Sequence, residues 1–217
     1  MPRDANDTRE RLITAGERLF ASRGVYQVTV REINEAAKQR NTSAIHYHFG
    51  SREGLLDAIL MRPQEALDAH RGQLLAELRA AGRDRDPFAL VMAMLIPLSV
   101  CLHTTSGRDY LRIVAQLVDR FPQWREELDL NPPNQKAVLH QTERQIPASV
   151  PRAVKRERMV NIMILMMAAI ANRARQMEEG DEMFLDDATF LDNLADMIVG
   201  ALMAEPTKRA PVRRSKR

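Results

Sequence analysis

Apolar residues recur at intervals of three and four along most of the chain, the spacing that brings side chains to one face of an α-helix. The first such face comprises Leu12, Ile13, Leu19 and Phe20. Asp7 and Glu10 precede it at the spacing of a capping box, so we predict that this helix begins at Asp7. Residues 25–28 are strand-like, but nothing else in the chain could pair with them, and we predict a connector there. The pattern predicts an all-α fold of about nine helices.

Two short helices joined by a tight polar turn are predicted next. Thr29 and Glu32 form a capping box, which predicts that the first of them begins at Thr29. Residues 38–41 carry no apolar period, and a second, unusually polar helix follows over about residues 42–49. This is the pattern of a helix-turn-helix, whose second helix enters the major groove of DNA with its N-terminal residues on the base edges. On the pattern alone, a purely structural helical hairpin remains the alternative.

Residues in and around this polar helix have the chemistry to contact DNA. Small side chains at 42–44 would let the backbone approach the groove, and Arg40 and Asn41 can hydrogen-bond to bases or phosphate. Tyr47 offers a phenolic donor, and Ser51 with Arg52 would bind phosphate at the start of the next helix. The predicted DNA-binding residues are Thr29, Arg40, Asn41, Thr42, Ser43, Ala44, His46, Tyr47, Ser51 and Arg52.

Longer and more apolar helices follow from residue 51. Ser51 is the predicted cap of a connecting helix over residues 51–81, kinked at Pro63. Further helices are expected over residues 87–104, from a cap at Ser106 to about Phe121, and over residues 136–145, 152–179 and 187–204. We therefore expect a helix-turn-helix domain over residues 1–50, a helical effector-binding and dimerisation domain over residues 51–204, and a tail over residues 205–217.

The charge of the chain is concentrated in that tail. The sequence has a formal net charge of +3, but residues 205–217 hold six basic residues against Glu205 alone, so the remainder is slightly acidic. Pro206 and Pro211 without apolar periodicity predict a disordered segment. It is either a solubilising terminus or an auxiliary electrostatic contact with nucleic acid.

Composition narrows the class of protein. The single cysteine, Cys101, excludes an internal disulfide and is typical of a reducing cytoplasm. The N-terminus has no apolar region of a secretory signal, and the longest apolar stretches, residues 90–102 and 162–171, are too short to span a bilayer. We expect a cytoplasmic protein that does not associate with membranes.

Four segments around the short helices carry a family resemblance: residues 8–13 (TRERLI), 19–24 (LFASRG), 29–37 (TVREINEAA) and, most specifically, 43–56 (SAIHYHFGSREGLL). They resemble the tetracycline-repressor-like (TetR/AcrR) family of transcription factors. The resemblance implies that Tyr47 contacts phosphate and that His48 and Phe49 dock the recognition helix. Lys38 stands where the family usually has glycine, so it would need a positive φ, which costs a non-glycine residue about 1 kcal/mol.

The remaining helices carry two further hypotheses. Methionines on two core helices are either flexible core filler or, as the resemblance implies, the lining of an apolar effector pocket. The candidate effector-binding residues are Met94, Leu98, Cys101, His103, Tyr110, Gln116, Met163, Met166 and Met167. Apolar spacing in the last helix forms either an intramolecular core or, as the resemblance favours, a dimer interface. The candidate dimer residues are Phe190, Leu194, Met197 and Ala201.

An enzyme is the rival class. No nucleophile motif, Gly-rich phosphate loop or Glu-x-x-His pair is present, so no catalytic residue and no cofactor are expected. His46 and His48, two apart on a helix, point to different faces and cannot bind one metal ion together. We therefore expect a homodimeric, ligand-responsive regulator, more a repressor than an activator, that binds palindromic double-stranded DNA and a small, mostly apolar effector. The alternative is a helical ligand-binding or adaptor protein with no specific DNA target.

Overall fold

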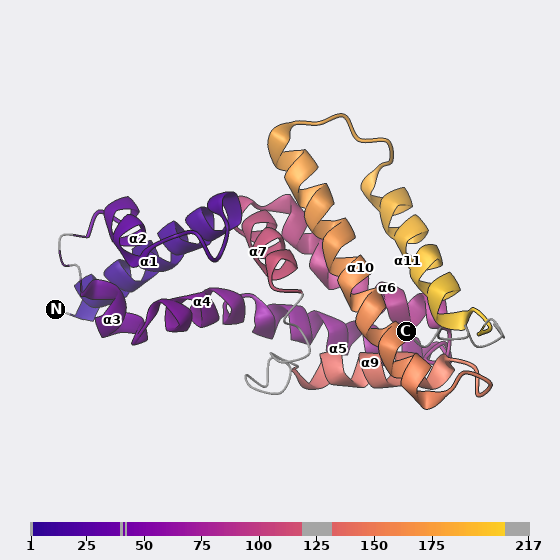
Figure 1. Ribbon diagram of the computed structural model, residues 1–217. Coiled ribbons are helices and arrows are strands. Elements are labelled where there is room, and N and C mark those ends of the chain that lie inside the picture. The colour runs from indigo at the N-terminus through magenta and orange to yellow at the C-terminus, as the bar shows by residue number, and fades with distance from the viewer. Residues whose placement is uncertain (1, 40, 42, 119–131, 207–217) are drawn as a thin grey trace, which may run out of the picture.

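A computed structural model describes residues 2–39, 41, 43–118 and 132–206, and all regular structure among them is helical (Figure 1). The all-α prediction is confirmed. In order, the elements are α1 (Pro2–Arg23), α2 (Val30–Ala36), α3 (Ala44–Phe49), α4 (Arg52–Met61), α5 (Gln64–Ala80), α6 (Pro87–Val100), a 3-10 turn (Cys101–His103), α7 (Thr105–Gln116), α9 (Pro133–Gln145), α10 (Arg152–Glu179) and α11 (Asp187–Met203). Most of the basic tail, residues 207–217, lies outside this description, as does the predicted end of the helix at Phe121.

Most helix boundaries follow the predicted caps. The side chains of Thr29, Ser51, Asp86 and Asp186 each accept a backbone N–H in the first turn of the following helix. The predicted connecting helix is divided at residues 62–63 into α4 and α5, because Pro63 has no N–H to continue the helical hydrogen bonds.

Two predicted caps are wrong. Helix α1 begins at Pro2, which suits the first turn of a helix because its missing N–H would have no partner there. Asp7 lies inside this helix and forms an ion pair of 3.4 Å with Arg11. Helix α7 is capped by Thr104, whose hydroxyl accepts from the Gly107 N–H at 3.0 Å, and not by Ser106.

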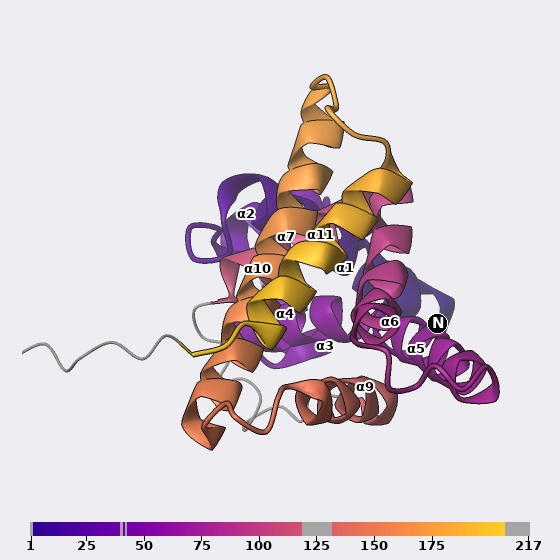
Figure 2. The same ribbon diagram turned by 90° about the vertical axis from the view of Figure 1, so that its right-hand side faces the viewer.

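The helices form a small head and a larger body. Helices α1, α2 and α3 gather at one end of Figure 1, and α4 and α5 follow one another from this head along the lower edge of the body. Helix α1 also packs against α7 of the body. Helices α10 and α11 run antiparallel, and Figure 2 shows them side by side on the face of the body that is turned away from the head. No helix in the described part of the chain has the length and apolar character needed to span a bilayer.

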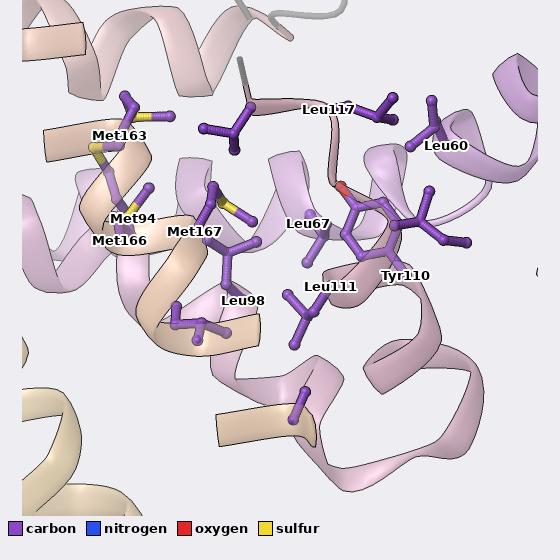
Figure 3. Packing of buried hydrophobic residues seen from close by; sticks show 14 of the residues in the cluster. Leu60, Leu67, Met94, Leu98, Tyr110, Leu111, Leu117, Met163, Met166 and Met167 are labelled. Atoms are coloured by element: carbon purple, nitrogen blue, oxygen red, sulfur yellow. The ribbon is translucent and has the colours of Figure 1, made fainter. Parts of the chain in front are cut away.

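One continuous apolar cluster connects head and body, from Leu12 to Leu202. Met94 of α6 packs with the buried methionines of α10, Met163, Met166 and Met167, in the centre of the body (Figure 3). Methionine fills irregular space because its side chain is unbranched and flexible. These methionines fill the centre of the core, the arrangement that the simpler of the two hypotheses describes.

Candidate nucleic-acid interface and adjoining cavity

A tight turn after α2 sets the direction in which α3 leaves it. The Lys38 N–H donates to the Glu35 carbonyl at 3.0 Å and the Gln39 N–H to the Asn34 carbonyl at 2.8 Å, the two bonds of a Schellman turn. Lys38 has φ = 54°, so the expected positive φ at this non-glycine position is confirmed. Its side chain is exposed and has no ion-pair partner in the described part of the chain.

The start of α3 presents small polar groups to solvent. The Asn41 side-chain oxygen accepts from the Ser43 N–H at 2.9 Å, which orients the first turn. Ser43 is exposed and its hydroxyl does not cap the helix. Ala44, by contrast, is 5% exposed and packs into the core, so its side chain itself is not presented to solvent. Arg40 and Thr42 lie outside the described residues.

Tyr47 stands out from the middle of α3. Its side chain is 79% exposed, and its ring meets that of His48 edge-on with the centroids 4.9 Å apart. His48 is half-buried against Phe49, whereas His46 is exposed. The two histidines therefore lie in different environments, and no three His, Cys, Asp or Glu side chains among the described residues could hold a metal ion together.

The turn from α3 into α4 depends on Gly54 and Ser51. The Ser51 hydroxyl accepts from the Gly54 N–H at 3.1 Å. A Cβ on residue 54 would lie 2.1 Å from the carbonyl oxygen of Phe49. Only glycine lets the two helices approach this closely, which fixes α3 against α4.

Arg52 is engaged inside the head. Its Nε donates to the Val28 carbonyl at 2.9 Å, and its guanidinium lies 4.9 Å from the ring centre of Phe20. Because these contacts leave only 20% of the side chain exposed, the structure places Arg52 as a link between the connector and α4. Phosphate binding by Ser51 and Arg52 stays a prediction.

Thr29 is exposed at the start of α2, in a rigid arrangement. The Glu32 carboxylate accepts from the Thr29 N–H and hydroxyl, each at 2.8 Å, and pairs with Arg23 at 2.7 Å. The Thr29 backbone and hydroxyl bonds, with the Arg23 charge, lower the pKa of Glu32 to about 2. The N-terminus of α2 therefore keeps a fixed geometry at neutral pH.

A cavity of about 470 Å³ lies where the head meets the body. It is bounded by the break between α4 and α5, by α6 and the start of α7, and by Glu17 of α1. Its lining comprises Glu17, Arg62, Pro63, Ala66, Leu67, His70, Pro97, Val100, Cys101, Thr104, Ser106, Gly107 and Tyr110. The volume is in the range of small-molecule sites.

The structure divides the candidate effector residues. Cys101 and Tyr110 line the cavity. Met94, Leu98, Met163, Met166 and Met167 lie in the buried core instead. His103 is exposed, because it sits in the 3-10 turn that ends α6. Gln116 holds the head, since its amide accepts from the Val25 N–H at 2.7 Å and donates to the Phe20 carbonyl at 3.2 Å.

Sequence reasoning missed Glu17, although a carboxylate on the apolar face of the first helix was visible between Ile13 and Phe20. Glu17 is 5% exposed, and its carboxylate accepts from the Ser106 hydroxyl at 2.9 Å. Arg62 lies 4.0 Å away. Burial raises the pKa of Glu17, and the Ser106 bond and the Arg62 charge oppose that rise.

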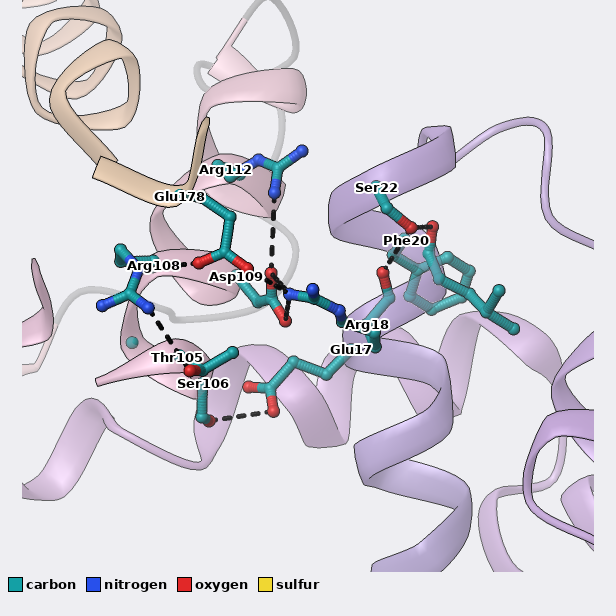
Figure 4. Close-up of polar contacts among 12 residues, drawn as sticks. Glu17, Arg18, Phe20, Ser22, Thr105, Ser106, Arg108, Asp109, Arg112 and Glu178 are labelled. Atoms are coloured by element: carbon teal, nitrogen blue, oxygen red, sulfur yellow. Dashed lines mark hydrogen bonds and ion pairs between the residues drawn. The ribbon is translucent and has the colours of Figure 1, made fainter. Parts of the chain in front are cut away.

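A network of ion pairs beside Glu17 joins α1 to α7 and α10 (Figure 4). Arg18 contacts the Asp109 carboxylate at 3.3 Å and that of Glu178 at 3.0 Å. Arg108 also pairs with Glu178, at 2.9 Å, and Arg112 lies 3.7 Å from Asp109. The position of α1, and with it the head, is thus fixed by charges on two helices of the body.

The candidate dimer residues of α11 point in two directions. Leu194 is buried within the chain, and Phe190 is half-buried with the Arg173 guanidinium 4.9 Å from its ring centre. Met197 is 53% exposed and Ala201 is also exposed. On the neighbouring α10, Ile164 is exposed as well, so both helices expose large apolar side chains among polar ones.

Comparison with known proteins bears on the head and on the larger body. Residues 12–59 match the family model described as bacterial regulatory proteins, tetR family. No curated protein matches the chain. NalD, the secondary repressor of the MexAB-OprM multidrug efflux pump in Pseudomonas aeruginosa, is similar in structure, with a TM-score of 0.52 and 18% identity over 93% of this chain and 98% of that chain.

Two further solved structures are similar with lower scores. A gamma-butyrolactone receptor (ArpA-like protein) has a TM-score of 0.46 and 20% identity over 90% of this chain and 97% of its own. GusR of Salmonella enterica has a TM-score of 0.38 and 20% identity over 90% of this chain and 95% of its own. The likeness to NalD covers head and body together. The chain therefore shares its overall fold with NalD, and its residues 12–59 match the tetR family model.

Proposed function

We propose that the protein is a transcriptional repressor that binds a palindromic operator as a homodimer and is released by a small effector. The observation that carries this proposal is the exposed polar edge of α3, which Gly54 and the Schellman turn hold in one orientation on the head. A helix used only for packing would have no need to keep Tyr47 79% exposed. Residues 1–50 would bind DNA, and residues 51–204 would bind the effector and dimerise.

On DNA, the head would divide its contacts between bases and phosphates. Ser43 and His46 are exposed at the start of α3 and would meet base edges in the major groove. Tyr47 would donate to a phosphate on one side and Lys38 would bind a phosphate as a free cation. Phosphate contacts position the helix, and the base contacts supply the sequence preference.

Dimerisation would use the outer face of α10 and α11. Ile164 of α10 and Met197 of α11 are exposed large apolar side chains. The two helices lie side by side on the part of the body that is turned away from the head (Figure 2). A two-fold pairing of this face would direct both heads to the same side. Two recognition helices must lie about 34 Å apart to enter successive major grooves, so an operator of two half-sites requires such a pair.

Effector binding would act through the cavity. Its wall includes Glu17 of α1 and also Arg62 and Pro63, which separate α4 from α5. A ligand there can change the spacing of the heads only if it binds the DNA-incompetent state more tightly, typically by about 1–3 kcal/mol. Operator DNA must then weaken effector binding by the same factor.

Fluorescence anisotropy on DNA from upstream of the protein's own gene tests the proposal. The expected result is tighter binding than to a shuffled duplex of equal length and composition, at physiological salt. Equal affinities for the two duplexes would favour the alternative, a helical ligand-binding or adaptor protein without a specific target. A full chain with Ser43→Trp serves as the matched control, because the bulk would block groove entry at an exposed position.

A further inference from the structure

Arg71 of α5 is a buried cation with unmet hydrogen-bond donors. It is 4% exposed, and its buried Nε and Nη1 groups donate to no acceptor among the residues that the structure describes. Arginine remains protonated at all ordinary pH values, so this charge cannot be removed by losing a proton. Burying it without an acceptor is unfavourable, which means that an acceptor is missing from the site.

The nearest acid is already occupied. Asp68, one turn before Arg71, accepts from the Asn134 side chain at 2.9 Å and from the Gln135 N–H at 2.9 Å. These bonds fix the start of α9 and use both carboxylate oxygens. Glu17, on the adjoining cavity, is held by Ser106 and Arg62. The Asp68 charge favours the Arg71 cation, but neither carboxylate accepts a hydrogen bond from Arg71 in the described part of the chain.

Two other incompletely bonded groups lie with Arg71. Gln64 stands two helical turns before it, on the same side of α5. The Gln64 amide nitrogen donates to the Tyr110 hydroxyl oxygen at 2.9 Å, while its own Oε1 is buried without a partner. The Tyr110 hydroxyl hydrogen therefore remains available to a further acceptor.

This polar cluster adjoins the cavity. Tyr110 belongs to both, and Leu67 and His70, which flank Arg71 on α5, also line the cavity. Burial raises the pKa of the Tyr110 hydroxyl and of the Cys101 thiol, and the Arg71 charge opposes the rise at both wall residues. Leu67 and Arg71 are four residues apart and lie on one side of α5, so Arg71 adjoins the wall that Leu67 contributes to the cavity.

We propose that the effector is an acid, a mostly apolar molecule whose carboxylate is bound by Arg71 and Tyr110. The guanidinium N–H groups match a carboxylate in geometry and charge, and the Tyr110 hydroxyl supplies a third donor. Gln64 Oε1 would accept from a hydroxyl or amide N–H next to the carboxylate. The apolar part would lie against Leu67, Pro97 and Cys101. This inference rests on the proposed function, because it names the chemistry of the effector in the same cavity.

The first arm of the test needs no ligand. Arg71→Met in the full chain should raise the melting temperature of the ligand-free protein, because it removes a buried charge whose hydrogen-bond donors are unmet. Arg173→Met is the matched control. Arg173 is equally buried, but its guanidinium donates to the Asp187 carboxylate at 2.6 Å and to the Leu185 carbonyl at 2.8 Å, so its loss should lower the melting temperature. A fall with Arg71→Met as well would show a satisfied structural arginine, bonded through ordered water, and would overturn the proposal.

The second arm uses calorimetry with octanoate and 4-phenylbutyrate against the corresponding amides, octanamide and 4-phenylbutanamide. The acids should bind the wild type at least about tenfold more tightly than the amides, and Arg71→Met should abolish that preference. Equal binding of acid and amide, or no binding of either acid, would overturn it. Failure of the proposed function would appear separately, as wild-type protein that does not distinguish its upstream DNA from the shuffled duplex.

Discussion

The Glu17 carboxylate accepts a hydrogen bond of 2.9 Å from the Ser106 hydroxyl, so the first helix of the head is joined to the start of α7. Burial raises the pKa of Glu17 above its ordinary value of 4.5. The folded state then holds this proton more tightly than the unfolded state. Its contribution to stability is therefore present below pH 4.5 and is lost as the pH rises through the raised folded-state pKa.

Glu17→Gln should remove this pH dependence. The glutamine oxygen can still accept from Ser106, but the side chain carries no charge to bury at neutral pH. We expect the melting temperature of the variant, relative to that of the wild type, to increase as the pH rises from acid to neutral. Thermal unfolding across this range measures the difference, with Glu65→Gln, an exposed position, as the control. A constant difference at all pH values would contradict the raised pKa.

Lys38→Gly should stabilise the fold and weaken DNA binding. Glycine adopts φ = 54° without strain, so the free energy of unfolding should rise by about 0.5–1 kcal/mol. The lost cation should reduce the slope of log K against log salt by about one. Lys38→Gln separates the effects, because it removes the charge and keeps the strain. An unchanged salt slope in both variants would remove Lys38 from the DNA surface.

Tyr47→Ala should weaken binding to every DNA sequence by about 1 kcal/mol and leave folding unchanged. The side chain is 79% exposed, so its loss removes little packing. Phe184→Ala is the control, since Phe184 is 96% exposed on the connection between α10 and α11, away from the head. Anisotropy titrations on specific and shuffled duplexes check both variants. An affinity of Tyr47→Ala equal to that of the control would count against a phosphate contact.

Gly54→Ala should destabilise the head by about 1–3 kcal/mol, the usual cost of overpacking. The new methyl carbon would lie 2.1 Å from the Phe49 carbonyl oxygen, so α3 or α4 must move. In Gly16→Ala, the control, the nearest atoms are terminal methyl carbons of Leu55 and Ile59, at 3.1 and 3.2 Å, which can rotate away. Chemical denaturation measures both, and equal stabilities would show that the turn is more adaptable than this geometry implies.

Met197→Arg should convert the proposed dimer to a monomer. The charge would lie on the outer face of α11, where pairing would bury it without a partner. Phe184→Arg introduces the same charge at an exposed position off that face. Light scattering after size-exclusion chromatography reports the mass of each. A dimer that survives Met197→Arg would place the interface elsewhere on the chain.

The helices were predictable from the sequence because local signals determine them. Capping side chains such as Thr29 and Asp186, and Gly180 at the end of α10, act within a few residues. The cap of α7 was missed because the sequence offers two hydroxyl residues close together. The Thr104 hydroxyl accepts from the Gly107 N–H, whereas the Ser106 hydroxyl donates to Glu17 of α1, which is distant in sequence.

The exposed residues of α3 and the residues that line the cavity also differ in how local their sequence signals are. The exposed residues of α3 belong to one contiguous motif, so the sequence identifies them together. The cavity assembles side chains that are far apart along the chain, such as Glu17, Arg62 and Tyr110, and no spacing rule connects them. Arg71 was missed because a lone arginine in an amphipathic helix gives no sign that it is buried.

Gln116 makes the head and the body poor candidates for exchange between proteins. Its amide satisfies two main-chain groups of the head, the Val25 N–H and the Phe20 carbonyl, that a body without this side chain would leave to water. A chimera that joins residues 2–61 to a related body would carry the recognition helix, but it would also need a hydrogen-bonding side chain for the Val25 N–H and the Phe20 carbonyl. Modular engineering of such regulators would therefore succeed first with acceptor bodies that carry a glutamine at the matching place in their seventh helix.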